Sequence, residues 1–508
     1  MSIPVAVSPS TLTPGIYLTV DLTAGAASPG TGLLSTLLIA PKASTGDLTV
    51  DSEIRAGGGP ASAVTAFGKG SIGQLMAKIL YAKDPTAQID FAAPTSGATA
   101  ATLDTTATGS PGAAGNVVEF NVAGRVTEVV WNASESADTF KTRAISSLNA
   151  ADQGELPVVA SSGGTGIITE TFRVTGTLGN DCLVRARLLY AQSGTEAIDN
   201  GTFTALAGGS TAADMTSILA AAAGKEYHYI VAAMGNAEAE GGTGSNNPTR
   251  LKTHINTYNS GLNAKLQQGI YGSTGTIANA KTGSVARNMG PMEHIHADSL
   301  LSLPGELAAR EAGGRLAAVK LDPAANRIGE VLDLLYGSAT PIADNPTAAE
   351  SEDAIGNGLS LCGYTASGEL YLLRGVTTYC QDAAGGADRR LLDTQNVDAS
   401  YIVVRDLRSA IPQEFAGAKV IRDTAPGEDP PPAGVTEERD IRSFVSNRLF
   451  FWADQGVLQR APLEEVILDG SLIVQVNDSD PTQVDIVIPF KVVQPLAKVG
   501  IVGQRIPG

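Results

Sequence analysis

The sequence predicts a multidomain chain of the α/β plus α+β class, built on an α/β core with a mostly parallel sheet. Strand-like runs alternate with helical periods in 23–94 and again in 210–345, which is typical of βαβ units. Between these two stretches, 95–209 holds short β-type runs separated by Gly, Ser and Thr, which indicates a β-rich insertion domain. Residues 346–490 mix a hairpin with amphipathic helices, which predicts a C-terminal α+β domain.

Composition limits the possible functions. The 508 residues carry 35 Lys+Arg and 52 Asp+Glu, a net charge of −17, which argues against wrapping nucleic acid or an anionic membrane. Three cysteines in no paired motif argue against a disulfide framework. No signal peptide or membrane span is expected. Only 17 % of residues are charged, which indicates either a Gly/Ala-rich globular protein or a surface covered by other subunits.

Both ends of the chain read as extended arms, 1–22 and 491–508. Prolines at 4, 9 and 14 exclude a helix from the first arm, and its residues 16–20 form a β-type run. The second arm is also β-type and has no obvious partner strand nearby. Such segments suit a strand at a sheet edge or on another molecule.

The core elements follow from hydrophobic periodicity. Residues 33–40 predict a buried strand and 74–82 a short helix. In the insertion, strands are expected at 117–122, 126–131, 158–160, 167–174 and 183–189, with a helix near 137–149. Later core strands are expected at 227–234, 269–272 and 292–297, and helices at 249–262, 277–287 and 305–319.

The C-terminal domain contains the clearest helix of the chain, 436–452. Thr436 is the expected N-cap, and the apolar stripe consists of Ile441, Phe444, Val445, Leu449 and Trp452. At 100° per residue the opposite side presents Arg439, Arg442, Ser446 and Phe450, which is either a contact surface or a solvated face. A hairpin is expected at 359–376, a helix at 399–411, and β-type runs at 471–476 and 484–489.

Motifs for chemistry are few. Residues 68–73 match G-x-G-x-x-G, a motif that binds a dinucleotide when a strand directly precedes it. The alternative is that these residues form the start of a helix capped by Ser71. His294 and His296 share one face of a predicted strand, and two ligands do not make a metal site. Walker, G-x-S-x-G and HExxH motifs are absent from the sequence. We expect no catalytic, cofactor or metal residues.

The C-terminal half contains four segments in a familiar order: 373–379, 436–452, 456–458 and 480–489. Upstream, 13–17, 67–73, 156–158, 179–180 and 207–209 fit the same pattern. With these segments the chain resembles the tail sheath proteins of contractile-tailed phages, in particular the Mu-like branch.

The resemblance implies a virion subunit that is assembled in the host cytoplasm. Subunits would stack as hexameric rings around an inner tail tube and contract to drive the tube through the host envelope during genome ejection. Baseplate and tail terminator proteins would be further partners, without direct nucleic-acid contact or membrane insertion. The alternatives are a nucleotide-binding α/β enzyme that uses 68–73, and the sheath of a tailocin or type VI-like apparatus.

The resemblance also implies site residues. The two arms of the chain would add strands to a neighbour's sheet. The residues involved would be Ile16, Tyr17, Leu18 and Val20 at the N-terminal end and Val492, Val493, Val499, Ile501, Val502 and Ile506 at the C-terminal end. Arg439, Arg442, Ser446 and Phe450 would contact the inner tube.

Overall fold

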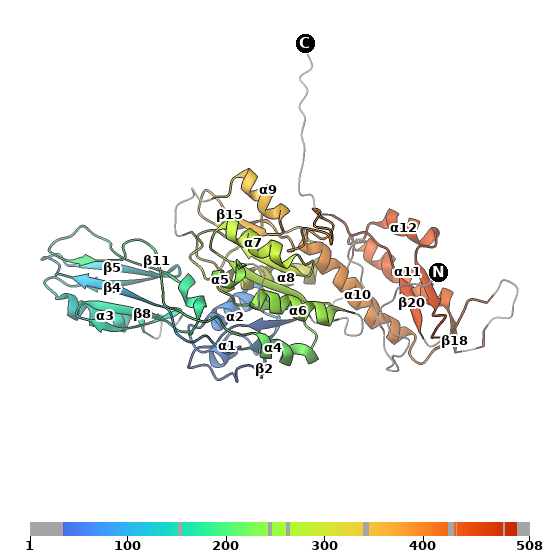
Figure 1. The fold of residues 1–508 in the computed structure, drawn as a ribbon, viewed down its shortest axis with the longest axis horizontal. Helices are drawn as coiled ribbons and strands as arrows, with labels where there is room; N and C mark the ends of the chain where they lie inside the picture. The colour runs from blue at the N-terminus through green and yellow to red at the C-terminus, as the bar shows by residue number, and fades with distance from the viewer. Residues whose placement is uncertain are drawn as a thin grey trace, which may run out of the picture.

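The computed structural model describes residues 34–150, 155–241, 246–260, 265–338, 345–424, 431–432, 434–480 and 483–494. The molecule is elongated, with residues 95–209 at one end, the main sheet and its helices in the middle, and the α-helical C-terminal part at the other end (Figure 1). Among the described helices, none has the length and apolar character needed to cross a bilayer.

The central element is an eight-stranded, mostly parallel sheet. Its order is β16 (Leu370–Arg374), β15 (Ser360–Tyr364), β14 (Met292–His296), β13 (Gln268–Ser273), β12 (Tyr229–Ala232), β1 (Ser35–Ile39), β3 (Gln88–Ala92) and β2 (Ile54–Ala56). Only the two edge strands, β16 and β2, run antiparallel to their neighbours. The predicted α/β class with a mostly parallel sheet is therefore confirmed, and the sheet joins segments from both sides of the insertion.

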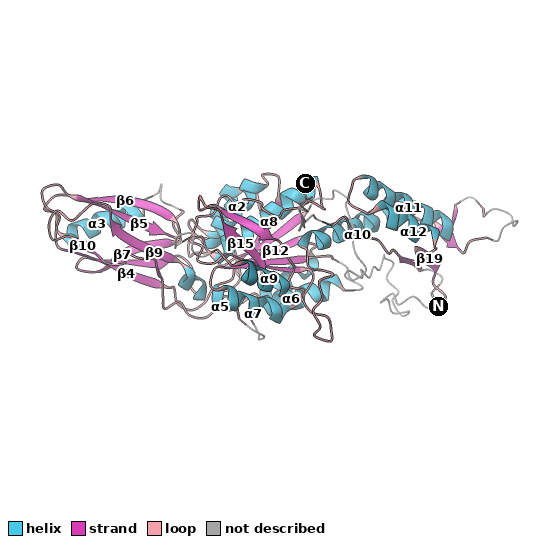
Figure 2. Ribbon diagram, turned by 90° about the horizontal axis from the view of Figure 1, so that it is seen from above, coloured by secondary structure: helices cyan, strands magenta, loops and turns pink. Residues whose placement is uncertain are grey.

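Helices cover both faces of this sheet, so its strands are apolar on both sides. Leu38 of β1 packs on the face covered by α1 (Pro60–Phe67), α2 (Ile72–Lys83) and α8 (Pro304–Leu321). Leu37 and Ile39 pack on the opposite face, with α4 (Thr216–Ala221), α5 (Asn236–Ala239) and α6 (Asn247–Asn259). Figure 2 shows α2 and α8 on one side of the sheet and α5, α6 and α7 (Ile277–Arg287) on the other.

One prediction about the main sheet needs correction, and one helix was not predicted. The hairpin expected in the C-terminal domain belongs to the main sheet, because β15 pairs in parallel with β14. The helix α9 (Ala348–Gly356) was not expected from the sequence; its N-cap Thr347 forms a capping box with Glu350. The T-x-x-E pattern of Thr347 and Glu350 is the local signal in the sequence for this helix start.

Residues 95–209 form two four-stranded antiparallel sheets and the helix α3 (Ala137–Leu148). One sheet has the order β10 (Ala197–Ile198), β4 (Thr102–Thr108), β8 (Ile167–Phe172) and β7 (Val158–Gly164). The other has the order β11 (Thr204–Ala205), β9 (Leu183–Leu188), β5 (Asn116–Val122) and β6 (Arg125–Trp131). Trp131 stacks on Phe140 of α3 with 4.4 Å between ring centroids, which joins the helix to the sheet.

The C-terminal part is built on three helices: α10 (Thr394–Glu414), α11 (Glu438–Asp454) and α12 (Arg460–Leu468). Two small sheets accompany them: β17 (Lys419–Ile421) with β18 (Val435–Glu437), and β19 (Ile473–Val476) with β20 (Val484–Val487). The expected stripe of α11 is buried at Ile441, Val445, Leu449 and Trp452, while Phe444 is half-buried against Phe415. The N-cap is Glu437, not Thr436: Glu437 forms a capping box with Asp440, whose side chain accepts a hydrogen bond from the Glu437 amide at 3.0 Å.

Glu170 is a buried carboxyl inside the β-rich part. Its side chain is fully covered and accepts one hydrogen bond, from Thr105 Oγ1 at 3.2 Å. Burial raises the pKa of Glu170 to about 8. The folded state therefore holds this proton more tightly than the unfolded state, and stability falls as the pH rises from about 4.5 to about 8.

We expect Glu170→Gln to stabilise the β-rich part by about 4 kcal/mol at pH 8 and by little at pH 4, because each pKa unit is worth about 1.4 kcal/mol. Urea unfolding followed by Trp131 fluorescence in a Trp452→Phe background measures this difference. Glu128→Gln, on the exposed side of β6, is the control and should change little at either pH. A pH-independent effect of Glu170→Gln would contradict the prediction.

Candidate functional site

The glycine loop 68–73 lies between two helices. The residues before it form α1 rather than a strand, and Ser71 caps α2 by accepting a hydrogen bond from the Gln74 amide at 3.3 Å. Gly70 has φ 72°, and a Cβ there would lie 2.4 Å from the carbonyl oxygen of Leu156. The loop is thus a capped helix entry covered by residues of the β-rich part, and it lacks the strand of a dinucleotide fingerprint.

The carboxyl edge of the parallel sheet, where α/β proteins usually bind ligands, is filled by the β-rich part. After β12, the Asn236 amide donates to Asp181 at 2.8 Å, at the end of the 3₁₀ helix Thr177–Asp181. After β14, Glu306 in the first turn of α8 pairs with Arg125 at 2.5 Å. Arg125 also lies over the Tyr336 ring, 4.8 Å from its centroid. The insertion therefore contacts the sheet at the edge where α/β proteins usually bind ligands.

The two histidines of β14 are buried structural residues. Ser273 Oγ lies 2.8 Å from both His294 Nε2 and His296 Nδ1, and Ser284 Oγ lies 3.1 Å from His294 Nδ1. Burial lowers the pKa of both rings, that of His296 to about 3, so they are neutral near pH 7. The described part of the chain contains no group of three His, Cys, Asp or Glu side chains placed to hold a metal. All three cysteines are buried and free.

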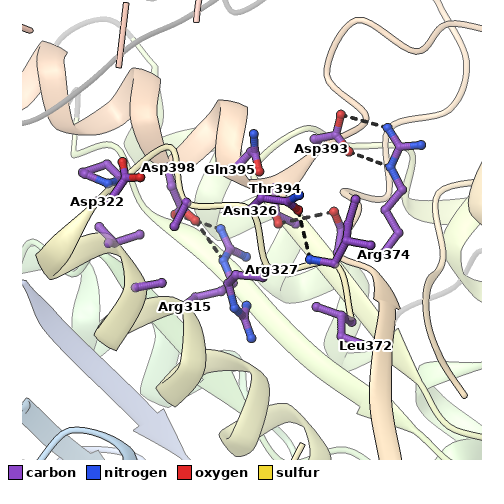
Figure 3. Close-up of a pocket in the computed structure, with 16 residues that line it drawn as sticks. Arg315, Asp322, Asn326, Arg327, Leu372, Arg374, Asp393, Thr394, Gln395 and Asp398 are labelled. Atoms are coloured by element: carbon purple, nitrogen blue, oxygen red, sulfur yellow. Dashed lines mark hydrogen bonds and ion pairs between the residues drawn. The ribbon is translucent and has the colours of Figure 1, made fainter. Parts of the chain in front are cut away.

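The most connected polar cluster joins α10 to the sheet. Arg315 of α8 donates to both oxygens of Asp398 on α10, at 2.8 and 3.0 Å, and to Glu293 of β14 at 2.7 Å. Asp398 also accepts hydrogen bonds from Tyr229 and Gln268, each at 2.7 Å. Figure 3 shows Arg315 and Asp398 facing each other between the two helices. The cavity beside them measures about 20 Å³, room for about one water.

The ionisable groups of this cluster have pKa values shifted in different directions. Burial alone would raise the pKa of Asp398, but the Arg315 guanidinium outweighs it and holds that pKa well below its usual range. Burial, with Glu311 nearby, raises the pKa of Glu293 despite the same arginine. Burial lowers the pKa of His228, 3.6 Å from Asp398, to about 4. The cluster therefore holds an ionised Asp398–Arg315 pair and has no exposed reactive group.

The second half of α10 connects the sheet to α11. Arg405 donates to the carbonyl oxygens of Tyr227, Lys265 and Leu266, at the amino ends of β12 and β13. Asp406, on the next position of the helix, accepts from Trp452 of α11 at 2.9 Å and pairs with Arg448 at 2.5 Å. One helix thus fixes both the sheet and the C-terminal part.

The side of α11 predicted as a contact surface is largely occupied by the chain itself. Arg439 remains exposed, at 54 %, and pairs with Glu437. Arg442 donates to the Val474 carbonyl at 3.1 Å and lies 3.4 Å from Asp423. Ser446 is half-buried, and Phe450 packs half-buried under Arg460 at 5.3 Å. The helical wheel placed these residues together, but β19 covers part of the face.

Val492 and Val493, two residues expected in the C-terminal arm, pack against the chain itself. Val492 is 1 % exposed and bridges to Leu458, and the Val493 amide donates to the Val457 carbonyl at 3.0 Å. The expectation that this end has no local partner is therefore wrong for Val492 and Val493. Val499, Ile501, Val502 and Ile506 lie outside the described residues, as do Ile16, Tyr17, Leu18 and Val20.

We expect Asp398→Ala to destabilise the fold by about 3 to 5 kcal/mol, because it leaves the Arg315 charge buried and unpaired. Urea unfolding followed by Trp452 fluorescence in a Trp131→Phe background measures the loss. Glu465→Ala, on the exposed side of α12, is the control and should stay within about 0.5 kcal/mol. A loss for Asp398→Ala no larger than the control would contradict the role given to the pair.

No protein-family model matches the chain. The chain is 26 % identical over 428 residues to the Mu-like prophage FluMu tail sheath protein of Haemophilus influenzae, with 81 % of each protein covered. The sheath tail protein crystal structure from Desulfitobacterium hafniense has TM-score 0.46 and 12 % identity, covering 95 % of this chain and 100 % of that one. The contracted helical sheath of the anti-feeding prophage has TM-score 0.45 and 10 % identity, covering 98 % and 99 %. On the sequence relationship, the chain is a tail sheath protein, a homologue of the Mu-like prophage sheath protein.

Proposed function

We propose that this sheath subunit polymerises as stacked hexameric rings around the inner tail tube of a phage, and contracts to drive the tube through the host envelope. The observation that carries the proposal is the relationship to a tail sheath protein across 81 % of both sequences. The chain is a structural protein of the virion rather than an enzyme. Its assembly in the host cytoplasm and its contacts with baseplate and tail terminator proteins are part of the proposal.

The terminal arms would connect the subunits. The run 16–20 and the residues after 494 are β-type sequences, and strand addition would supply backbone hydrogen bonds between copies. Extended arms can bend while these bonds persist, so rings could rotate and approach one another without dissociating. The arm at the C-terminal end would start after Gln494, whose Oε1 lies 3.3 Å from Asn396 Nδ2 at the start of α10.

Contraction would draw its energy from surface buried between the folded bodies of neighbouring copies. Apolar area contributes about 25 cal/mol per Å² when it leaves water. A charged fraction of 17 % favours such contacts, because few ions must lose their hydration when the surfaces meet. A gain of a few kcal/mol per subunit, repeated over many rings, would drive the tube without nucleotide hydrolysis.

We expect the purified full chain, alone or with its tube protein, to form tubes or cogwheel-shaped rings in negative-stain electron microscopy. A chain lacking residues 1–22 should stay monomeric, because it loses strand addition at one end, and should keep its circular dichroism spectrum. A deletion of 425–430, in the proline-rich loop, is the control and should still polymerise. A monodisperse full chain that binds nucleotide would refute the proposed function.

The tube contact would use the exposed end of the α11 face. We expect Arg439→Glu to reduce co-sedimentation of the tube protein with the assembled sheath, because it reverses the charge of a side chain that is 54 % exposed. Arg389→Glu, on the exposed loop before α10, is the matched charge reversal and should leave co-sedimentation unchanged. Equal tube retention by both variants would exclude Arg439 from the contact.

A further inference from the structure

Each of the two sheets in the β-rich part has one short and one long edge strand. The short edge strands, β10 and β11, contain two residues each. The long edge strands, β6 and β7, contain seven residues each. Both long edges expose valine side chains: Val126 and Val130 of β6 are 49 % and 54 % exposed, and Val159 of β7 is 38 % exposed. A long edge strand with exposed apolar side chains is a template for pairing with another chain.

The turn before β6 determines which of its backbone groups point out of the sheet. β5 and β6 are joined by the two-residue turn Ala123–Gly124, in which both residues have positive φ, 49° and 83°. The residues that flank such a turn exchange both ladder bonds, and bonded and non-bonded pairs alternate from there along the strands. The amide and carbonyl groups of Val126, Glu128 and Val130 therefore point away from β5.

The backbone groups of Ala160 lie on the outer side of β7. Directly before β7, the Arg173 amide donates to the Pro157 carbonyl at 2.8 Å, so by alternation Val159 is bonded to β8 and Ala160 is not. Asn149, the C-cap of α3, donates from Nδ2 to the Ala160 carbonyl at 2.7 Å and accepts from the Ala160 amide at 3.0 Å. One amide side chain thus binds both groups, as a residue of an added strand would.

α3 also covers the edge of β6. Arg143 Nη1 donates to the Val130 carbonyl at 2.6 Å and to Glu135 at 2.9 Å, which holds the guanidinium in place. The helix is fixed on the sheets by its buried side, where Phe140 and Leu148 are fully covered. A single helix therefore places one polar side chain on each of the two long edges.

We propose that α3 closes both long edges, and that without Arg143 and Asn149 the β6 edge of one copy would pair with the β7 edge of a second copy. Charge favours this combination. Glu128 is exposed in the middle of β6, so two β6 strands paired about their centres would place two carboxylates opposite each other. β7 has no charged residue. Because the two edges differ, their contact would not close on itself and would join copies into open chains.

This pairing needs two copies in solution and no assembled tube. Under the proposed function it would also act between neighbouring subunits, where a sheet continued from one copy into the next would oppose movement of the rings. Closed edges leave the β-rich parts free to move past one another.

Two chains opened at different edges test the proposal. One full chain carries Arg143→Ala and one cysteine on β6, and the other carries Asn149→Ala and one cysteine on β7. The cysteines are placed in turn at exposed positions of the two strands: Val126, Val130, Val159 and Ser161. The three natural cysteines are buried. After mixing and mild oxidation, we expect covalent dimers on a non-reducing gel, and mass spectrometry of the joined peptides should show β6 linked to β7.

Matched controls use the same cysteines. Chains with Thr142→Ala and Ser146→Ala, on the exposed side of α3, keep both edge contacts and should give no dimer. Two chains that both carry Arg143→Ala should give none either, because their β7 edges stay closed and their Glu128 side chains repel each other. Dimers of equal yield in the controls would overturn the proposal. It would also be overturned if the opened chains gave no dimer while keeping the circular dichroism spectrum of the parent.

Hydrogen exchange provides a second measurement that does not depend on disulfide geometry. In the parent chain we expect the Ala160 amide to be protected although it lies on the outer side of an edge strand, because Asn149 accepts its hydrogen bond. Asn149→Ala should remove this protection and leave the amides of β8 protected. Free exchange of the Ala160 amide in the parent, or equal protection in the variant, would overturn the role given to α3. None of these results depends on whether tubes form.

Discussion

The pair between Arg315 and Asp398 is the contact on which the arrangement of the whole subunit depends. Arg315 belongs to a helix that covers the sheet, and Asp398 lies near the start of the helix that leads to the C-terminal part. Both side chains are at most 3 % exposed, so neither can exchange its partner for water without unfolding part of the chain. Because α10 is held in this way, a load applied to the C-terminal part would reach the sheet through one helix.

In the described part of the chain, side chains of the protein itself lie at the places where an α/β scaffold usually binds a ligand. The carboxyl edge of the sheet is a usual place for a ligand, and here Asp181 and Arg125 of the β-rich part occupy it. The glycine loop caps a helix, and the histidines of β14 share one serine. The surfaces and strand edges of the molecule are suited to contacts with other subunits, which agrees with the structural role of a sheath subunit.

Locally encoded features were predictable from the sequence, and non-local ones were not. The bounds 277–287 expected for one helix are those of α7, because its periodicity and its cap are local. The hairpin of β15 and β16 was predicted, but its place beside β14 depends on a parallel pairing that no local pattern encodes. Val492 was expected in a strand without a partner in its own chain, because its partner, Leu458, lies 34 positions earlier. Helical periodicity predicts the side of α11 on which Arg442 lies. It does not predict that β19 lies beside that side, because the contact is non-local.

The central claim is that a rigid subunit works through strands exchanged with its neighbours. Helical reconstruction of the assembled tube by cryo-electron microscopy tests it most directly. We expect α10 to keep its contact with Arg315 in every copy, and density leading away from Leu34 to continue into a strand added to a sheet of an adjacent subunit. Density that returns from Leu34 to a sheet of its own copy, with all ladders complete within one chain, would contradict this claim.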